Sequence, residues 1–199
     1  MYSPRVEHAI TTMLEAHGVA RRKAGRSFQA SHALSVAMIV SDYGFDEDTV
    51  VAALLHDTLE DTELNPDIIQ SRFGAPVLDI VRDVSEPPRP RMWRDRKSVY
   101  IAQIRDSPRQ GTWAVAAADK IHNLSKMTQG LCEQGEAYVR PFTAPVEDMI
   151  WYHETVLTTL QNNWTHAILA EQTRRFDAFV EASANLRSVS RPSTALRRQ

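Results

Sequence analysis

At 199 residues, the chain is long enough to bury one good hydrophobic core, which predicts a single domain. Its 43% hydrophobic and 24% charged residues are typical of a globular protein. A net charge of −2 gives no global positive excess for non-specific nucleic-acid binding, so we expect no nucleic-acid partner and any phosphate-binding surface must be local. Cys132 is the single cysteine, which excludes a disulfide framework and a thiolate metal cluster. Because we find no long apolar run and no apolar leader, we expect a cytoplasmic protein with no membrane partner.

Apolar residues recur at helical spacing along the chain, and we find no convincing alternating strand pattern. The first helix is predicted from about Pro4 to Lys23, and a polar segment, 25–31, separates it from a second helix that ends at Gly44. Asp46 is predicted to cap a third helix. Further helices are predicted over about 66–74, 75–85, 92–105, 111–128, 145–161 and 164–187, with the proline-rich segment 87–90 as a surface loop.

These segments predict one all-α domain over residues 1–187. The remaining residues, 188–199, include three arginines, no acid and little apolar content, so we expect a disordered basic tail.

The third predicted helix runs from an apolar stretch directly into His56-Asp57 and, after two residues, into Glu60-Asp61. Burying so many ionisable groups without partners costs several kcal/mol, so we expect these side chains to bind a positively charged group. His32 and Asp119 lie on two other predicted apolar helices and meet the same need. Two imidazoles and two carboxylates without a thiolate favour Mn²⁺, Fe²⁺ or Mg²⁺ over a structural zinc, in a site with positions left for water and substrate.

The second acidic pair follows the first at a spacing of four residues, which is one helical turn if the helix continues. Glu60 and Asp61 are therefore predicted to lie beside the open face of the metal site, where a general base or a water-orienting group belongs. Without a metal, the simpler interpretation is that they begin a solvated acidic loop with Glu63 and Asp67.

Three sequence motifs resemble those of one known family. His32, His56-Asp57 and Asp119 match the H…HD…D pattern of HD-domain metal-dependent phosphohydrolases. The segment 56–62, HDTLEDT, resembles the HDTxEDT signature of RelA/SpoT-type alarmone hydrolases, and 118–124, ADKIHNL, resembles their ADKLxNL motif. Over about residues 5–165 the chain is similar to this family, and in particular to its stand-alone, Mesh1-like members.

The resemblance implies a bundle of about ten helices that hydrolyses the alarmones (p)ppGpp, a small-molecule nucleotide substrate, to GDP or GTP and pyrophosphate with one Mn²⁺ ion. Carried over by position, His32, His56, Asp57 and Asp119 would bind the metal, and Glu60 and Asp61 would activate water. The candidate substrate-binding residues are Arg22, Lys23, Lys97, Asn123 and Tyr152.

Two alternatives stay open at this point. The chain could be an HD phosphohydrolase for another nucleotide, such as an adenine alarmone, NADPH or a nucleoside phosphate, or a non-catalytic metal-binding interaction module. The segment from Phe28 to Ala33 differs from the family pattern of proline-tyrosine followed by histidine-proline, and the loop before it is short. Because the resemblance implies that this loop helps to shape the base pocket, guanine specificity depends on the part of the chain that is least similar to the family. The sequence does not indicate the oligomeric state.

Overall fold

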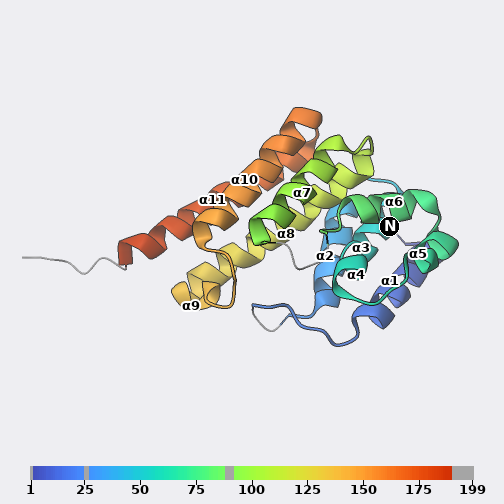
Figure 1. Cartoon of the computed structure of the whole chain (residues 1–199), viewed down its shortest axis with the longest axis horizontal. Coiled ribbons are helices and arrows are strands. Elements are labelled where there is room, and N and C mark those ends of the chain that lie inside the picture. The colour runs from blue at the N-terminus through green and yellow to red at the C-terminus, as the bar shows by residue number, and fades with distance from the viewer. Residues whose placement is uncertain (1, 25–26, 88–91, 190–199) are drawn as a thin grey trace, which may run out of the picture.

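The computed structural model describes residues 2–24, 27–87 and 92–189 (Figure 1). These residues form helices and no strand, with an isolated bridge between Arg21 and Phe28. The predicted all-α class is confirmed. The helices are α1 Pro4–His17, α2 Gln29–Asp42, α3 Glu47–Leu55, α4 Thr58–Asp61, α5 Pro66–Phe73, α6 Ala75–Asp83, α7 Trp93–Asp106, α8 Gln110–Gln134, α9 Glu136–Val139, α10 Val146–Asn163 and α11 Ala167–Val189.

The first helix shows why a predicted boundary was wrong. Ser3 caps α1 by accepting a hydrogen bond from the Val6 backbone N–H, and Pro4 occupies the first helical position. The helix ends at His17 because Gly18 adopts φ 51°, a left-handed conformation that stops helical hydrogen bonding. The expected continuation to Lys23 instead forms a loop, which returns along itself through the bridge to Phe28.

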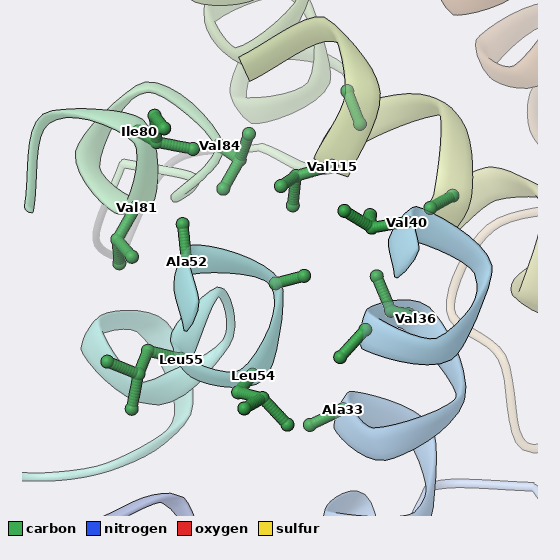
Figure 2. Close-up of a cluster of buried hydrophobic side chains, with 14 of the residues drawn as sticks. Ala33, Val36, Val40, Ala52, Leu54, Leu55, Ile80, Val81, Val84 and Val115 are labelled. Atoms are coloured by element: carbon green, nitrogen blue, oxygen red, sulfur yellow. The ribbon is translucent and has the colours of Figure 1, made fainter. Parts of the chain in front are cut away.

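The centre of the larger hydrophobic core is α3, which is apolar on all sides. Its residues from Val50 to Leu55 are at most 3% exposed, because α1, α2, α6 and α8 all pack against this helix. Figure 2 shows the three helices that face one another here, with a labelled residue of α8. The labelled residues are Ala33, Val36 and Val40 of α2, Ala52, Leu54 and Leu55 of α3, Ile80 and Val81 of α6 with Val84 just after its end, and Val115 of α8. This packing places the end of α3 beside α2 and α8.

A second, smaller core joins the C-terminal half of α8 to α9, α10 and α11. It contains Leu124, Leu131, Tyr138, Met149 and Phe179. The ring of Tyr138 lies directly against α8 at Gly130, where a Cβ atom would come within 2.2 Å of the ring. Because only glycine permits this contact, Gly130 determines how closely α9 approaches α8.

Other boundaries differ from the predictions in ways that bear on the site. The apolar helix ends at Leu55, so His56 and Asp57 lie in the turn between α3 and the four-residue helix α4, and the helix does not continue unbroken. The helix α8 extends six residues beyond its predicted end, and α9 was not predicted. Residues 188 and 189 belong to α11, whereas the rest of the predicted tail and residues 88–90 of the proline-rich loop lie outside the described residues. None of the helices in the described ranges is long and apolar enough to cross a bilayer.

Candidate active site

A cavity of about 930 Å³ opens where α2, the α3–α4 turn and α8 meet. All eleven residues that the sequence singled out for metal, water or substrate lie on its walls: Arg22, Lys23, His32, His56, Asp57, Glu60, Asp61, Lys97, Asp119, Asn123 and Tyr152. They come from seven helices and loops that are distant in sequence. The fold thus gathers the predicted residues into a single hollow.

Four of these residues converge at the innermost end of the cavity. His32 Nε2 lies 3.2 Å from His56 Nε2, 3.2 Å from Asp119 Oδ1 and 3.4 Å from Asp57 Oδ2. His56 Nε2 lies 3.1 Å from Asp57 Oδ1. One ligand atom from each of His32, His56 and Asp119 lies within 4.8 Å of the others, which is close enough for all three to hold one metal ion.

The hydrogen bonds behind the two imidazoles turn both Nε2 atoms toward this centre. The Nδ1 of His56 lies 2.8 Å from the backbone carbonyl of Ala53, which can only accept, so that Nδ1 carries the proton. The Nδ1 of His32 lies 2.8 Å from Nδ1 of His122. Burial, followed by the neighbouring His32, lowers the pKa of His122 to about 4, so this ring is neutral at pH 7 and its Nδ1 can accept a hydrogen bond from the Nδ1–H of His32.

The protonation states of His32, Asp57 and Asp119 suit metal binding. Burial lowers the pKa of His32, so its ring is neutral near pH 7. Burial on its own would raise the pKa values of both aspartates, but the neighbouring lysine and histidines outweigh it. Lys120 and His32 hold the pKa of Asp119 well below its usual range, and His56 and His32 lower that of Asp57. A neutral His32 imidazole beside ionised carboxylates supplies donor atoms of the kind that a divalent cation requires.

A further set of contacts holds Asp119 from behind. The ammonium of Lys120 lies 2.6 Å from Oδ2, and the amide of Asn123 donates to Oδ1 at 2.5 Å. Arg22 in turn donates to the Asn123 carbonyl oxygen at 2.5 Å. These contacts leave the carboxylate little freedom to rotate, since each oxygen has its own donor.

The second acidic pair lies in α4, beside this centre and open to solvent in the cavity. The backbone N–H of Glu86 donates to Glu60 Oε2 at 3.3 Å, and the Gln29 amide donates to Asp61 Oδ2 at 2.6 Å. The surrounding protein, and then the carboxylates of Glu86 and Asp57, raise the pKa of Glu60 to about 7. The surrounding protein, followed by the carboxylate of Asp57, also raises the pKa of Asp61. The pKa values of both groups therefore lie closer to neutral pH than those of ordinary carboxyls, which favours proton transfer near pH 7.

Cationic side chains line the cavity on the side of α7 and α8. Lys97 forms an ion pair with Glu86, and its ammonium lies 4.5 Å from the centre of the Tyr152 ring. Lys120 approaches the same ring at 5.0 Å, so two buried ammonium groups share one aromatic side chain. Arg96 also reaches Glu86, at 3.4 Å. Arg94, which lies on the same helix, instead pairs with Asp148 and stacks on Trp151.

Several residues around the site were missed by reasoning from sequence. Gln29, Glu86 and Lys120 line the cavity, His122 lies against His32, and all four touch a predicted site residue. Lys120 and His122 stand next to Asp119 in the ADKIHNL motif, so their position could have indicated them. Gln29 and Glu86 have no such signal, because their partners are brought close only by the tertiary fold.

Comparison with known proteins places the chain in a class. Residues 9–140 match the HD domain family, and the chain therefore belongs to the HD domain family. The buried His32, His56 and Asp119 group lies within the matched segment.

Individual relatives narrow this class. The chain is 38% identical over 85 residues to the guanosine-3′,5′-bis(diphosphate) 3′-pyrophosphohydrolase of Aquifex aeolicus, covering 43% of this chain and 12% of that protein. It is 37% identical over 102 residues to the mouse guanosine-3′,5′-bis(diphosphate) 3′-pyrophosphohydrolase MESH1, covering 50% of this chain and 55% of MESH1. The chain thus spans less than two thirds of the length of both relatives.

Solved structures support the same fold. A structure described as a metazoan ortholog of SpoT that hydrolyzes ppGpp superposes with a TM-score of 0.74 at 23% identity, covering 89% of this chain and 96% of the other. The structure of lmo0812 from Listeria monocytogenes EGD-e gives a TM-score of 0.69 at 29% identity, covering 75% of this chain and 99% of that one.

Proposed function

We propose that this protein is a metal-dependent (p)ppGpp 3′-pyrophosphohydrolase, which releases pyrophosphate and leaves GDP or GTP. The observation that carries the proposal is the cavity, in which a buried His/Asp centre, a separate acidic pair and several cations face the same space. The printed functions of the Aquifex and mouse relatives support the choice of substrate. The cytoplasmic location stays a prediction from the sequence.

In this proposal His32, His56, Asp57 and Asp119 hold one Mn²⁺ ion, with Fe²⁺ and Mg²⁺ as alternatives. The geometry fits a cation, because two Nε2 atoms 3.2 Å apart and two ionised carboxylates point at one place. A bound divalent ion supplies Lewis acidity, which polarises a phosphoryl oxygen and makes an attacking water more acidic.

Glu60 and Asp61 orient the attacking water and take its proton. The water oxygen bonds to the 3′-phosphorus, the bond from that phosphorus to O3′ breaks, and O3′ takes up a proton as pyrophosphate leaves. The raised pKa values of both carboxyls support this role, and the pKa of Glu60, about 7, suits a group that accepts and returns a proton near neutral pH. A purely structural metal site would have no use for a second acidic pair in the same cavity.

The phosphates of the substrate carry several negative charges, and the proposed residues offer matching cations. Arg22, Lys23 and Lys97 contact phosphate oxygens, Asn123 contacts the ribose or a nearby phosphate, and Tyr152 lines the nucleotide space. Support comes from the position of Lys97, whose ammonium is buried against Tyr152 and faces the cavity.

The test is a product analysis. Protein loaded with Mn²⁺ is incubated with ppGpp, pppGpp, ppApp, NADPH and common nucleotides, and the products are separated and identified. We expect pyrophosphate and GDP from ppGpp, and none from the Asp119→Ala variant. Inorganic phosphate from NADPH, or turnover of ppApp alone, would replace the proposed substrate with another nucleotide. No turnover of any substrate would favour the non-catalytic alternative.

A further inference from the structure

We propose that Gln29 is a positioning residue that holds Asp61 in place for water activation. The proposal rests on the proposed function for the role of Asp61, and it adds a residue for which neither the sequence motifs nor the comparisons assign a role. Gln29 is the first residue of α2, and its side chain reaches across the cavity mouth to α4.

The backbone holds Gln29 firmly at this place. Its N–H donates to the Ala20 carbonyl oxygen at 2.9 Å, and the Arg22 N–H donates to the Ser27 carbonyl oxygen at 3.1 Å. Between these bonds lies the bridge from Arg21 to Phe28, over whose ring the Arg21 guanidinium sits at 4.2 Å. The start of α2 is therefore tied to the loop that precedes it.

The chemistry of its two neighbours determines which way the Gln29 amide points. Nε2 donates to Asp61 Oδ2 at 2.6 Å, and Oε1 accepts from Arg22 at 3.2 Å. A guanidinium can only donate, and an ionised carboxylate can only accept. The reversed amide would place oxygen against oxygen and N–H against N–H, so one orientation is strongly favoured.

The same arrangement occurs a second time on the other side of Arg22. Its guanidinium donates to the Asn123 carbonyl oxygen, and the Asn123 amide donates to Asp119. One arginine thus orients two amides, and each amide donates to a carboxylate of the site. Asn123 serves the candidate metal ligand, and Gln29 serves the proposed water-activating group.

The hydrogen bond from Gln29 matters more to Asp61 than the hydrogen bond from Asn123 matters to Asp119. Among the described residues, Gln29 is the only side chain that donates a hydrogen bond to the Asp61 carboxylate, whereas Lys120 also supports Asp119. The Asp61 side chain is open to the cavity, so without Gln29 it can rotate away from an attacking water. Partners of this kind typically contribute about 10- to 100-fold to activity.

The test replaces the amide with a group of equal length that cannot hydrogen-bond. We expect Gln29→Met to lower kcat for ppGpp about tenfold, within the range for such partners, while KM changes less than about threefold. Gln29→Glu keeps the length but places a negative charge against Asp61, so kcat should fall further at pH 7. Gln70→Met, on the exposed side of α5, is the matched control.

A double-mutant cycle separates action through Asp61 from other effects. In an Asp61→Asn background, Gln29→Met should change kcat by less than about twofold. A full tenfold loss in both backgrounds, or wild-type kcat in Gln29→Met alone, would overturn the proposal.

A second measurement does not depend on turnover. The Gln29 hydrogen bond lowers the pKa of Asp61, so Gln29→Met should raise the pKa of that carboxyl when it is followed by carbon-13 NMR in the full chain. An unchanged value would refute the contact whichever substrate the protein hydrolyses. If the wild type fails to act on ppGpp but this pKa rises as expected, the proposed substrate is wrong and the positioning of Asp61 stands.

Discussion

The innermost end of the cavity and its mouth are built in different ways. At the innermost end, His32, His56 and Asp119 are 2%, 3% and 9% exposed, and each has a partner that fixes its orientation. At the mouth, Glu60 and Asp61 are open to solvent, and each carboxylate is held by one hydrogen bond from another element. The residues proposed to hold the metal should therefore tolerate little substitution around them. In contrast, Glu60 and Asp61, proposed to act on water, can lose their geometry without any change in the hydrophobic core.

The largest effect is expected at the innermost end. Asp119→Ala removes a carboxylate that lies 3.2 Å from His32 Nε2, so metal affinity should fall by more than about 100-fold, and activity with it. Metal content after gel filtration, together with titration calorimetry, measures this loss. A variant that retains a full equivalent of metal would show that Asp119 is not a ligand.

At the mouth, activity and metal binding should separate. Glu60→Gln or Asp61→Asn should lower kcat by about 10²- to 10⁴-fold, because a general base is lost, while the metal stays bound. Steady-state kinetics and calorimetry on the same preparations test this separation. Near-wild-type turnover in either variant would rule out that residue as the water-activating group.

A moderate effect is expected at the cationic side chains that line the cavity on the side of α7 and α8. Lys97→Met should raise KM for ppGpp about tenfold and leave metal affinity unchanged, because one charged hydrogen bond to phosphate is removed. Arg94→Met is the matched control, since Arg94 loses only its contacts with Asp148 and Trp151. Equal KM values in both variants would place the phosphates elsewhere.

The smallest effect is on stability and follows from the pKa of Glu60, which is raised from 4.5 to about 7 in the folded chain. Between these pH values the folded state binds more protons than the unfolded state, so stability falls as the pH rises through this window. Glu60→Gln should remove the penalty. Without added metal, the difference between the Tm of this variant and that of the wild type should therefore shift in favour of the variant between pH 5 and pH 8. Glu63→Gln, on the loop after α4, controls for the loss of one negative charge.

The same two regions differ in how well the sequence predicted them. The cluster of His32, His56, Asp57 and Asp119 could be predicted because histidines and aspartates on apolar helices are costly to bury, and their positions therefore stand out. The contacts of Gln29 and Glu86 could not, because Gln29 lies 32 residues from Asp61 and Glu86 lies 26 residues from Glu60. Ordinary polar residues in loops and at helix ends carry no pattern that indicates such distant partners.

Helix prediction shows a similar limit. Long amphipathic helices such as α10 were predicted within one or two residues of their observed ends, because apolar spacing repeats over several turns. The four-residue helices α4 and α9 were missed, since a single turn offers no repeat. The predicted end of α1 lies six residues beyond the observed one, because Gly18 stops the helix while the sequence around it is still compatible with one.

The candidate ligands come from three elements that are separate in sequence, with His32 and His56 24 residues apart and Asp119 much further along the chain. An ion held by all three would act as a cross-link that the unfolded chain lacks. At a free concentration of 100 times Kd, one site adds about 2.7 kcal/mol to the free energy of unfolding. The supply of metal would then influence how long each molecule survives proteolysis, in addition to how fast it works.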